Sequence, residues 1–165
     1  MRFTNRVLVA VTSFLTVLSP ALNGPHIARA IPAIGGSAAG DMAFVEQVMF
    51  HTTIADFARL AGHGDPWFDW TTDGCSAPFI GSTGRTFDFR TPCRRHDFGY
   101  RNLARMEQRY GSGATFWNAS GRLRVDRQLR ADMKEHCQSR RWLDRPSCLA
   151  WADTFYAAVR VAGGP

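Results

Sequence analysis

Two short clusters of residues carry the groups that a metal-assisted hydrolysis needs. Residues 93–100 include His96 and Asp97, and an earlier cluster places Asp73 directly before Gly74. Histidine serves as a general base near neutral pH. Calcium prefers carboxylate and backbone carbonyl oxygens as ligands. His96 is therefore a candidate base, and Asp73, Gly74 and Asp97 are candidate calcium ligands.

A histidine base also needs a carboxylate that orients its second ring nitrogen. The next predicted helix offers Asp126 and Asp132, which lie roughly 600° apart around a helix and therefore face different directions. Only one of them can meet His96. Asp126 lies beside Val125 and Leu129 of the apolar stripe, which favours it as a buried partner. By spacing alone, such a His–Asp pair is more often structural than catalytic, and an Asp in a turn more often caps a helix.

The first thirty residues have the pattern of a signal peptide. Arg2 and Arg6 precede the mostly apolar residues 7–18, a run too short to span a bilayer. Small-residue cleavage sites follow at Ala21 and Ala30, and the second fits the cleavage pattern better. We expect residues 1–30 to be removed on export and residues 31–165 to form one extracellular domain.

All four cysteines lie in the mature domain. An even number in a small exported domain predicts two disulfide bonds, and three pairings are possible. No pair has the Cys-x-x-Cys spacing of a structural zinc site. The cysteines are Cys75, Cys93, Cys137 and Cys148.

The basic composition does not require a nucleic-acid partner. The formal charge of +6 falls to +3 without residues 1–30, because these contain three arginines and no acidic residue. No dense arginine stripe is apparent, so we expect no nucleic-acid binding.

The elements that position these groups are helices. Apolar residues recur at steps of three and four, and no strand ladder is apparent. Asp41 is the expected cap of the first helix, and Thr52 and Thr53 are the expected break within it. Residues 67–92 read as a loop. The predicted helices are 41–61, 93–110, 123–136 and 148–161.

These segments together resemble the secreted phospholipase A2 family of actinomycetes and fungi. The resemblance covers about residues 67–163, nearly all of the expected core, and it includes the Cys137 to Cys148 spacing. The segments that carry it are residues 69–75, 93–102, 124–137 and 150–159.

The resemblance implies an all-α fold, in which a small disulfide-stapled domain holds two antiparallel active-site helices and a calcium-binding loop. It also implies calcium-dependent hydrolysis of the sn-2 ester of glycerophospholipids by water. The implied roles are His96 as base, Asp126 as its partner, Asp73, Gly74 and Asp97 as Ca²⁺ ligands, Tyr100 as a possible support, and Cys75–Cys93 and Cys137–Cys148 as the disulfides.

The chain departs from the family pattern in two places. The family has a bulkier residue at the position of Gly74, and the loop between the first two cysteines lacks an Asp-x-Pro-Phe-Gly stretch. The connection between Tyr110 and Gly121 is also longer than expected. Both changes bear on calcium affinity and head-group preference rather than on the reaction type.

Such an enzyme works at a phospholipid membrane or micelle surface, and we expect a monomer without a protein partner. Aromatic and apolar residues near the loop could meet acyl chains or fill the core, and nearby arginines could meet phosphate or be solvated surface charges. An alternative function is a catalytically weak, secreted lipid-binding or toxin-like relative. The residues considered for lipid contact are Trp67, Phe68, Phe79, Ile80 and Phe87, and those for phosphate are Arg85, Arg94, Arg95 and Arg101.

Overall fold

The computed structural model describes residues 34–75, 83–84 and 87–163. They belong to one compact unit, Ile31–Pro165, whereas the predicted signal peptide, residues 1–30, lies outside the described residues. Within the described part the fold is all-α with two disulfides, as predicted. The helices are α1 (Ala38–Phe50), α2 (Ile54–Leu60), α3 (Arg90–Tyr110), α4 (Ala119–Gln138) and α5 (Arg145–Ala162).

The first predicted helix is two helices, and the break falls where the threonines indicated. The Thr53 side chain accepts a hydrogen bond from the backbone N–H of Asp56 and so caps α2. The predicted cap of α1 was wrong, because Ser37 caps that helix. Asp41 is instead fully buried in the first turn. It accepts hydrogen bonds from the Trp67 indole and the Tyr110 hydroxyl, which tie the start of α1 to distant segments.

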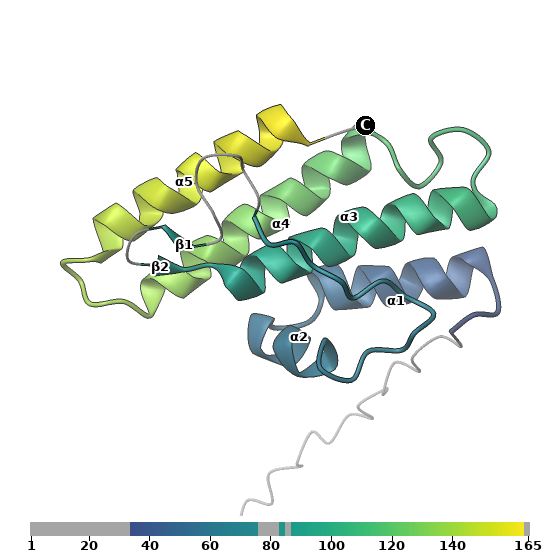
Figure 1. Ribbon diagram of the computed structural model, residues 1–165, viewed down its shortest axis with the longest axis horizontal. Coiled ribbons are helices and arrows are strands. Elements are labelled where there is room, and N and C mark those ends of the chain that lie inside the picture. Colours follow the sequence, from purple (N-terminus) through teal and green to yellow (C-terminus); the bar gives the residue numbers. More distant parts are fainter. Residues whose placement is uncertain (1–33, 76–82, 85–86, 164–165) are drawn as a thin grey trace, which may run out of the picture. The chain divides into compact units, whose positions relative to one another are not determined.

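Helices α3, α4 and α5 lie side by side and run alternately in opposite directions, while α1 packs along α3 (Figure 1). The approach of α1 and α4 to α3 depends on Gly99. A Cβ atom at Gly99 would lie 2.8 Å from Met49 and 2.9 Å from Val125, which is too close for any larger residue without displacement. This contact sets the spacing of the helices one turn after His96.

The apolar interior consists of two clusters. The disulfide core gathers around both disulfides, and its largest members are Phe89, Phe155, Leu129 and Met133. The aromatic core joins α1, α2 and α3, and its members include Phe57, Phe68, Phe98, Met49 and Val125. Helices α3 and α4 each contribute residues to both cores. On each helix, the residues between those two sets lie where the cores meet.

Several elements differ from the sequence expectation, and α3 begins at Arg90, inside the predicted loop, rather than at residue 93. A two-stranded antiparallel ribbon joins β1 (Thr83–Gly84) to β2 (Phe87–Asp88), where no strand was predicted. Two residues per strand are too few to produce an alternating pattern. Helices α4 and α5 also begin three or four residues before the predicted starts, because Asn118 caps α4 and Pro146 occupies the first turn of α5.

The long connection between α3 and α4 is organised by one carboxylate. Glu107 accepts hydrogen bonds from the backbone N–H groups of Gly113, Phe116 and Trp117. The Trp117 ring then packs edge-on against Tyr100, with ring centroids 4.8 Å apart. The long connection therefore places the Trp117 side chain against Tyr100.

Candidate active site

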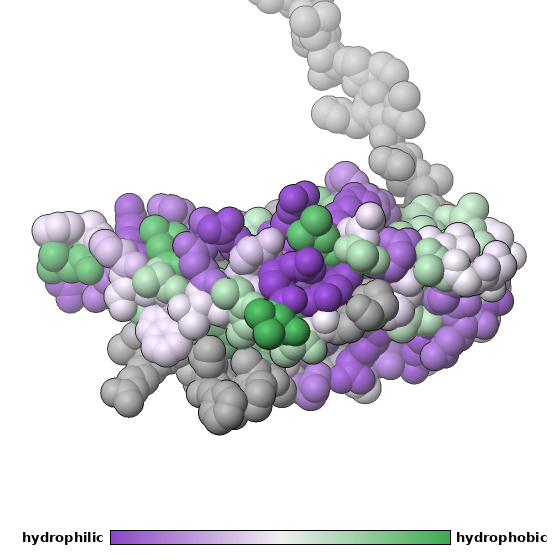
Figure 2. All heavy atoms as spheres, turned by 90° about the horizontal axis from the view of Figure 1, so that it is seen from above, coloured by the Kyte–Doolittle hydropathy of each residue, from purple (hydrophilic) through white to green (hydrophobic). Residues whose placement is uncertain are grey.

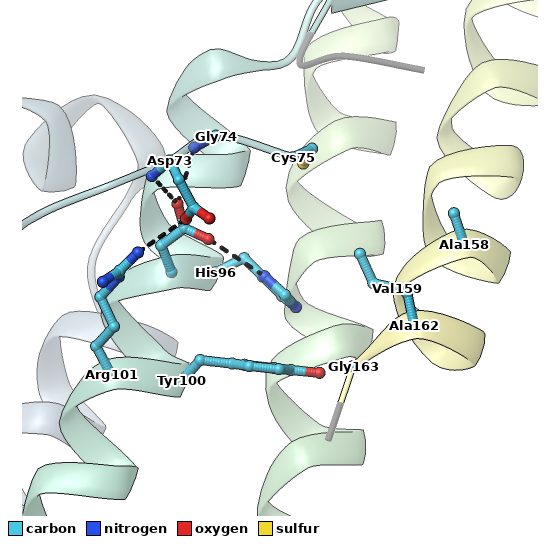
Figure 3. A pocket seen from close by; sticks show the side chains of 11 residues that line it. Asp73, Gly74, Cys75, His96, Tyr100, Arg101, Ala158, Val159, Ala162 and Gly163 are labelled. Atoms are coloured by element: carbon cyan, nitrogen blue, oxygen red, sulfur yellow. Dashed lines mark hydrogen bonds and ion pairs between the residues drawn. The ribbon is translucent and has the colours of Figure 1, made fainter. Parts of the chain in front are cut away.

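A pocket of about 310 Å³ opens where α3, the end of α5 and the segment before Cys75 come together. His96, Tyr100 and Arg101 reach it from α3, and small apolar residues line its α5 side (Figure 3). All three candidate calcium ligands, Asp73, Gly74 and Asp97, line the same pocket. The structure thus brings the two sequence clusters into one cavity.

His96 and Asp126 face each other across α3 and α4. The His96 Nε2 atom lies 2.8 Å from Asp126 Oδ1, and the Asp126 side chain is fully buried. The other carboxylate on α4, Asp132, binds the buried guanidinium of Arg95 instead. The choice between the two aspartates, made from the apolar stripe, agrees with this geometry.

Three further groups hold the Asp126 carboxylate. The Tyr100 hydroxyl donates to Oδ1 at 2.7 Å, and Arg160 Nη1 donates to Oδ2 at 2.6 Å from α5. Arg122, one turn earlier on α4, lies 3.6 Å from Oδ2. Burial opposes the charge, but hydrogen bonds from His96, Arg160 and Tyr100 keep the pKa of Asp126 below its usual value. Asp126 is therefore ionised at neutral pH.

The second nitrogen of His96 is directed into the pocket. An ionised Asp126 accepts the Nε2 proton, which leaves the lone pair on Nδ1. Nδ1 lies 3.9 Å from Asp97 Oδ1 (Figure 3). Burial lowers the pKa of His96, but the interactions with Asp126 and Asp97 outweigh it, and the net pKa is raised above 6.5. The Tyr100 ring packs against the imidazole at a tilt of 38°, with centroids 4.3 Å apart.

The segment that carries Asp73 is held at both ends. Upstream, the buried Asn102 side chain on α3 binds both the N–H and the carbonyl of Asp69, each at 2.8 Å. Downstream, the disulfide between Cys75 and Cys93 joins the segment to the first turn of α3. The five residues between these anchors form no regular secondary structure. Their position over the pocket is therefore fixed, although their own backbone is not part of a helix or strand.

Asp97 organises this segment by accepting several donors on one oxygen. Its Oδ2 accepts from the Thr72 hydroxyl at 2.5 Å and from the N–H groups of Asp73 and Gly74 at 3.2 Å each. Gly74 has a φ of 74°, in the left-handed region that costs other residues about 1 kcal/mol or more. Glycine at this position therefore accommodates the backbone conformation of the turn.

Asp73 is the most exposed of the acidic residues in the pocket. Its side chain is 65% exposed, and Arg101 donates to Oδ1 at 2.8 Å. Burial raises the pKa of Asp73, but the hydrogen bond and charge of Arg101 outweigh it and lower the pKa below its usual value. Both this carboxylate and Arg101 are charged at neutral pH, and each partly neutralises the other.

The donor set suits a hard cation. Asp73 and Asp97 supply carboxylate oxygens, Gly74 supplies a backbone carbonyl, and the pocket offers no thiolate, because Cys75 is in a disulfide. Within the described residues, no group of three or more His, Cys, Asp or Glu side chains is placed to hold a metal. A cation at this position would therefore complete its shell with backbone, water or substrate oxygens.

Several residues considered for lipid contact serve the interior instead. Phe68 and Phe87 are buried in the aromatic and disulfide cores. Arg95 is buried against Asp132 and cannot reach a phosphate, and Arg94 donates to the Ala61 carbonyl. Trp67 is half-buried and donates its indole N–H to Asp41. Phe79, Ile80 and Arg85 lie outside the described residues.

Sequence reasoning missed Arg122 and Arg160 as partners of Asp126. Arg122 precedes Asp126 by four residues, a spacing that puts both on one helix face and could have indicated the contact. Arg160 comes from α5, 34 residues away, and no local pattern connects it to the site. The Arg122 guanidinium also donates to the Val159 and Arg160 carbonyls and so fastens the end of α5 to α4.

No helix in the described part of the chain is long and apolar enough to cross a membrane. Residues 45–163 match the family model described as prokaryotic phospholipase A2. The chain is 30% identical to a secretory phospholipase A2 of Arthroderma benhamiae, over 87% of this chain and 92% of that protein. It is 33% identical to a secretory phospholipase A2 of Beauveria bassiana, over 72% of this chain and 57% of that protein.

Proposed function

Because this chain belongs to the prokaryotic phospholipase A2 family, we propose that it is a secreted, calcium-dependent phospholipase A2. Its reaction is hydrolysis of the sn-2 ester of glycerophospholipids to a fatty acid and a lysophospholipid. One observation carries the proposal. His96 is bound through Nε2 to the buried Asp126, and it turns its other nitrogen into a pocket that Asp73 and Asp97 also line.

The dyad activates water without a covalent intermediate. A water molecule at His96 Nδ1 loses a proton to the imidazole as its oxygen attacks the ester carbonyl. Asp126 keeps Nε2 protonated and stabilises the imidazolium that forms. The imidazolium then returns the proton to the departing lysophospholipid oxygen. Tyr100 and Arg160 hold the carboxylate in place throughout.

Calcium is the cofactor that the donor set favours. Asp73, Asp97 and the Gly74 carbonyl would hold it, and when bound it supplies positive charge for the developing oxyanion and for the substrate phosphate. Arg101 now occupies one oxygen of Asp73. Release of that pair would free the Arg101 guanidinium to contact the phosphate.

Secretion is supported by three independent features. Residues 1–30 carry the signal-peptide pattern, all four cysteines are in disulfides, and such bonds persist in oxidising compartments. The relatives from both fungi are named secretory.

The test is fatty-acid release from mixed phosphatidylcholine micelles that carry a distinguishable acyl chain at each position. We expect release of the sn-2 chain in calcium, loss of release in excess chelator, and recovery when calcium is restored. The matched control is His96→Asn, which should release little under either condition. Release of the sn-1 chain would contradict the proposed regiochemistry.

A folded, disulfide-intact protein that releases no fatty acid in calcium would contradict the proposal. If that protein still binds micelles, the better function is a catalytically weak, secreted lipid-binding relative. The failure could come from a metal loop that does not bind calcium or from a dyad that does not activate water. Calcium titration by calorimetry separates these two causes, because it measures metal binding without requiring turnover.

A further inference from the structure

Large apolar side chains are exposed mainly on one part of the molecule. Trp142, Leu143 and Val161 are 74%, 59% and 88% exposed, and among the described residues only Leu60 joins them in this class. Trp142 and Leu143 lie in the turn before α5, and Val161 lies in its last turn. Exposed large apolar side chains at both ends of one helix suggest that the surface between them makes a contact.

One row of exposed residues along α5 between these positions carries no charge, although Asp153 beside it is exposed. Ala150, Thr154, Ala157 and Val161 are exposed and follow steps of four, three and four residues, so they form one row along the helix. After the first turn, the charged residues of α5 are Asp153 and Arg160. Both point toward α4, where Asp153 binds Arg130 and Arg160 binds Asp126.

This row leads directly to the pocket. Ala158 and Ala162 follow Ala157 and Val161 on the helix, and both line the pocket beside His96 (Figure 3). We use the name α5 face for Trp142, Leu143, Ala150, Thr154, Ala157 and Val161. By helix geometry it extends about 27 Å, from the turn to the mouth of the pocket.

The turn at the far end of the α5 face is both rigid and basic. The disulfide between Cys137 and Cys148 closes it, and the Asp144 N–H donates to the Arg141 carbonyl. Arg140, Arg141 and Arg145 surround the exposed Trp142 and Leu143, and Asp144 is the one acidic residue between the two cysteines. Figure 2 looks onto the α5 side and shows hydrophobic residues at its left end, where Figure 1 places this turn.

We propose that the α5 face is the surface that lies on the phospholipid membrane, with the arginine-flanked turn as its anchor. Tryptophan and leucine insert favourably at a lipid–water boundary, and arginines beside them attract anionic head groups. An uncharged row between anchor and pocket lets the helix lie flat without desolvating ions. The orientation would present the pocket mouth to the lipid layer, so this inference rests on the proposed function.

The test is co-sedimentation with phosphatidylcholine vesicles, with and without phosphatidylglycerol. All proteins carry His96→Asn so that the vesicles stay intact. Relative to that background, Trp142→Ser with Leu143→Ser should weaken binding by about tenfold or more, and Thr154→Asp should weaken it severalfold. Arg141→Gln should weaken binding only to vesicles that contain phosphatidylglycerol, and added salt should abolish its effect. Leu60→Ser is the matched control and should bind as the background does.

A second readout separates binding from chemistry. With His96 intact, the turn and Thr154 variants should hydrolyse a short-chain phospholipid below its micelle concentration at the unaltered rate, while losing activity on vesicles. Vesicle binding that no variant changes would contradict the proposal that the α5 face lies on the membrane. So would ultracentrifugation showing that the face holds two copies together. Protein that binds vesicles through the turn but releases no fatty acid would support the α5 face as the membrane-binding surface and contradict the proposed function.

Discussion

The two sides of the pocket are built in different ways. His96 and Asp126 project from two packed helices at the junction of the two cores, and Asp126 is fully buried. Asp73 projects from a segment without regular structure and is 65% exposed. We call the first the dyad side and the second the loop side.

The difference shows which part of the geometry is fixed before a ligand arrives. Packing determines the dyad side, because moving His96 or Asp126 would disturb the helices that carry them. The loop side is held by the Cys75–Cys93 disulfide, by hydrogen bonds and by one ion pair. The hydrogen bonds and the ion pair can be exchanged for a cation or a phosphate at small cost. Changes on the dyad side should therefore affect turnover, and changes on the loop side should affect binding.

The largest expected effect comes from removing the base. His96→Asn should lower turnover about 10²- to 10⁴-fold, because an amide cannot accept the proton of water. Asp126 keeps Tyr100 and Arg160 as partners, so circular dichroism and thermal unfolding should change little. His136→Asn, on α4 outside the pocket, is the control. Wild-type turnover in the His96 variant would contradict the assignment of His96 as the base.

Removing the two disulfides one at a time should affect calcium binding differently on the two sides of the pocket. Replacing either pair of cysteines with alanine should lower the free energy of unfolding by about 2–4 kcal/mol. Loss of Cys75–Cys93 should also abolish calcium binding, because it frees one end of the loop side. Loss of Cys137–Cys148 should leave calcium binding intact. Calorimetry on both variants makes the measurement, and equal calcium affinities would contradict the comparison.

The pH dependence should move activity and stability in opposite directions. The raised pKa of His96 means that activity falls about tenfold per pH unit below a midpoint above 6.5. For stability, a raised folded pKa gives a contribution that is complete below the unfolded pKa and lost as pH rises through the folded value. The pH profile of kcat/KM and urea unfolding measure the two trends. His96→Asn should remove the His96 contribution to the stability trend, and urea unfolding of the metal-free protein without that contribution would contradict the raised pKa.

A smaller effect is expected from Tyr100→Phe. The change removes one hydrogen bond to Asp126 but keeps the ring packed against His96. A single hydrogen bond of this kind contributes about 1 kcal/mol, which corresponds to about a fivefold loss of kcat. Steady-state kinetics on a monomeric substrate would measure it. An effect on KM alone would place Tyr100 on the loop side instead.

The smallest effect should come from Arg101→Gln. Removing the guanidinium takes one hydrogen-bond donor from Asp73 and a positive charge out of the pocket, so calcium should bind up to about fivefold more tightly. Calorimetry of the metal-free protein measures this change. KM for phospholipid should rise at the same time if Arg101 contacts phosphate. Weaker calcium binding would show that Arg101 holds Asp73 in position for the metal.

The sequence predicted the dyad side better than the loop side. Helix periodicity located α3 and α4, and the apolar stripe beside Asp126 distinguished it from Asp132. These inferences hold because local spacing determines which helix residues share a face. Arg160 could not be found in this way, since its contact with Asp126 depends on how α5 packs.

On the loop side the sequence identified residues but not their conformation. Nothing local indicates that Asp97 accepts the Asp73 and Gly74 N–H groups, or that Gly74 takes a positive φ. The sequence left Phe68 and Phe87 open between lipid contact and the core, because proximity to the loop in sequence does not decide burial, and the structure places both in the core. Phe68 belongs to the aromatic core and Phe87 to the disulfide core.

The Arg160–Asp126 contact limits how this protein can change by mutation. Asp126 joins three helices, so replacing it with a neutral residue would leave Arg122 and Arg160 facing each other without an anion. Such a variant would lose stability as well as any catalytic role, and recovery would require compensating changes in both arginines. Replacing His96 with a neutral residue leaves no such pair of arginines without an anion. For an inactive protein intended for crystallisation with intact lipid, His96 is therefore the better position to alter.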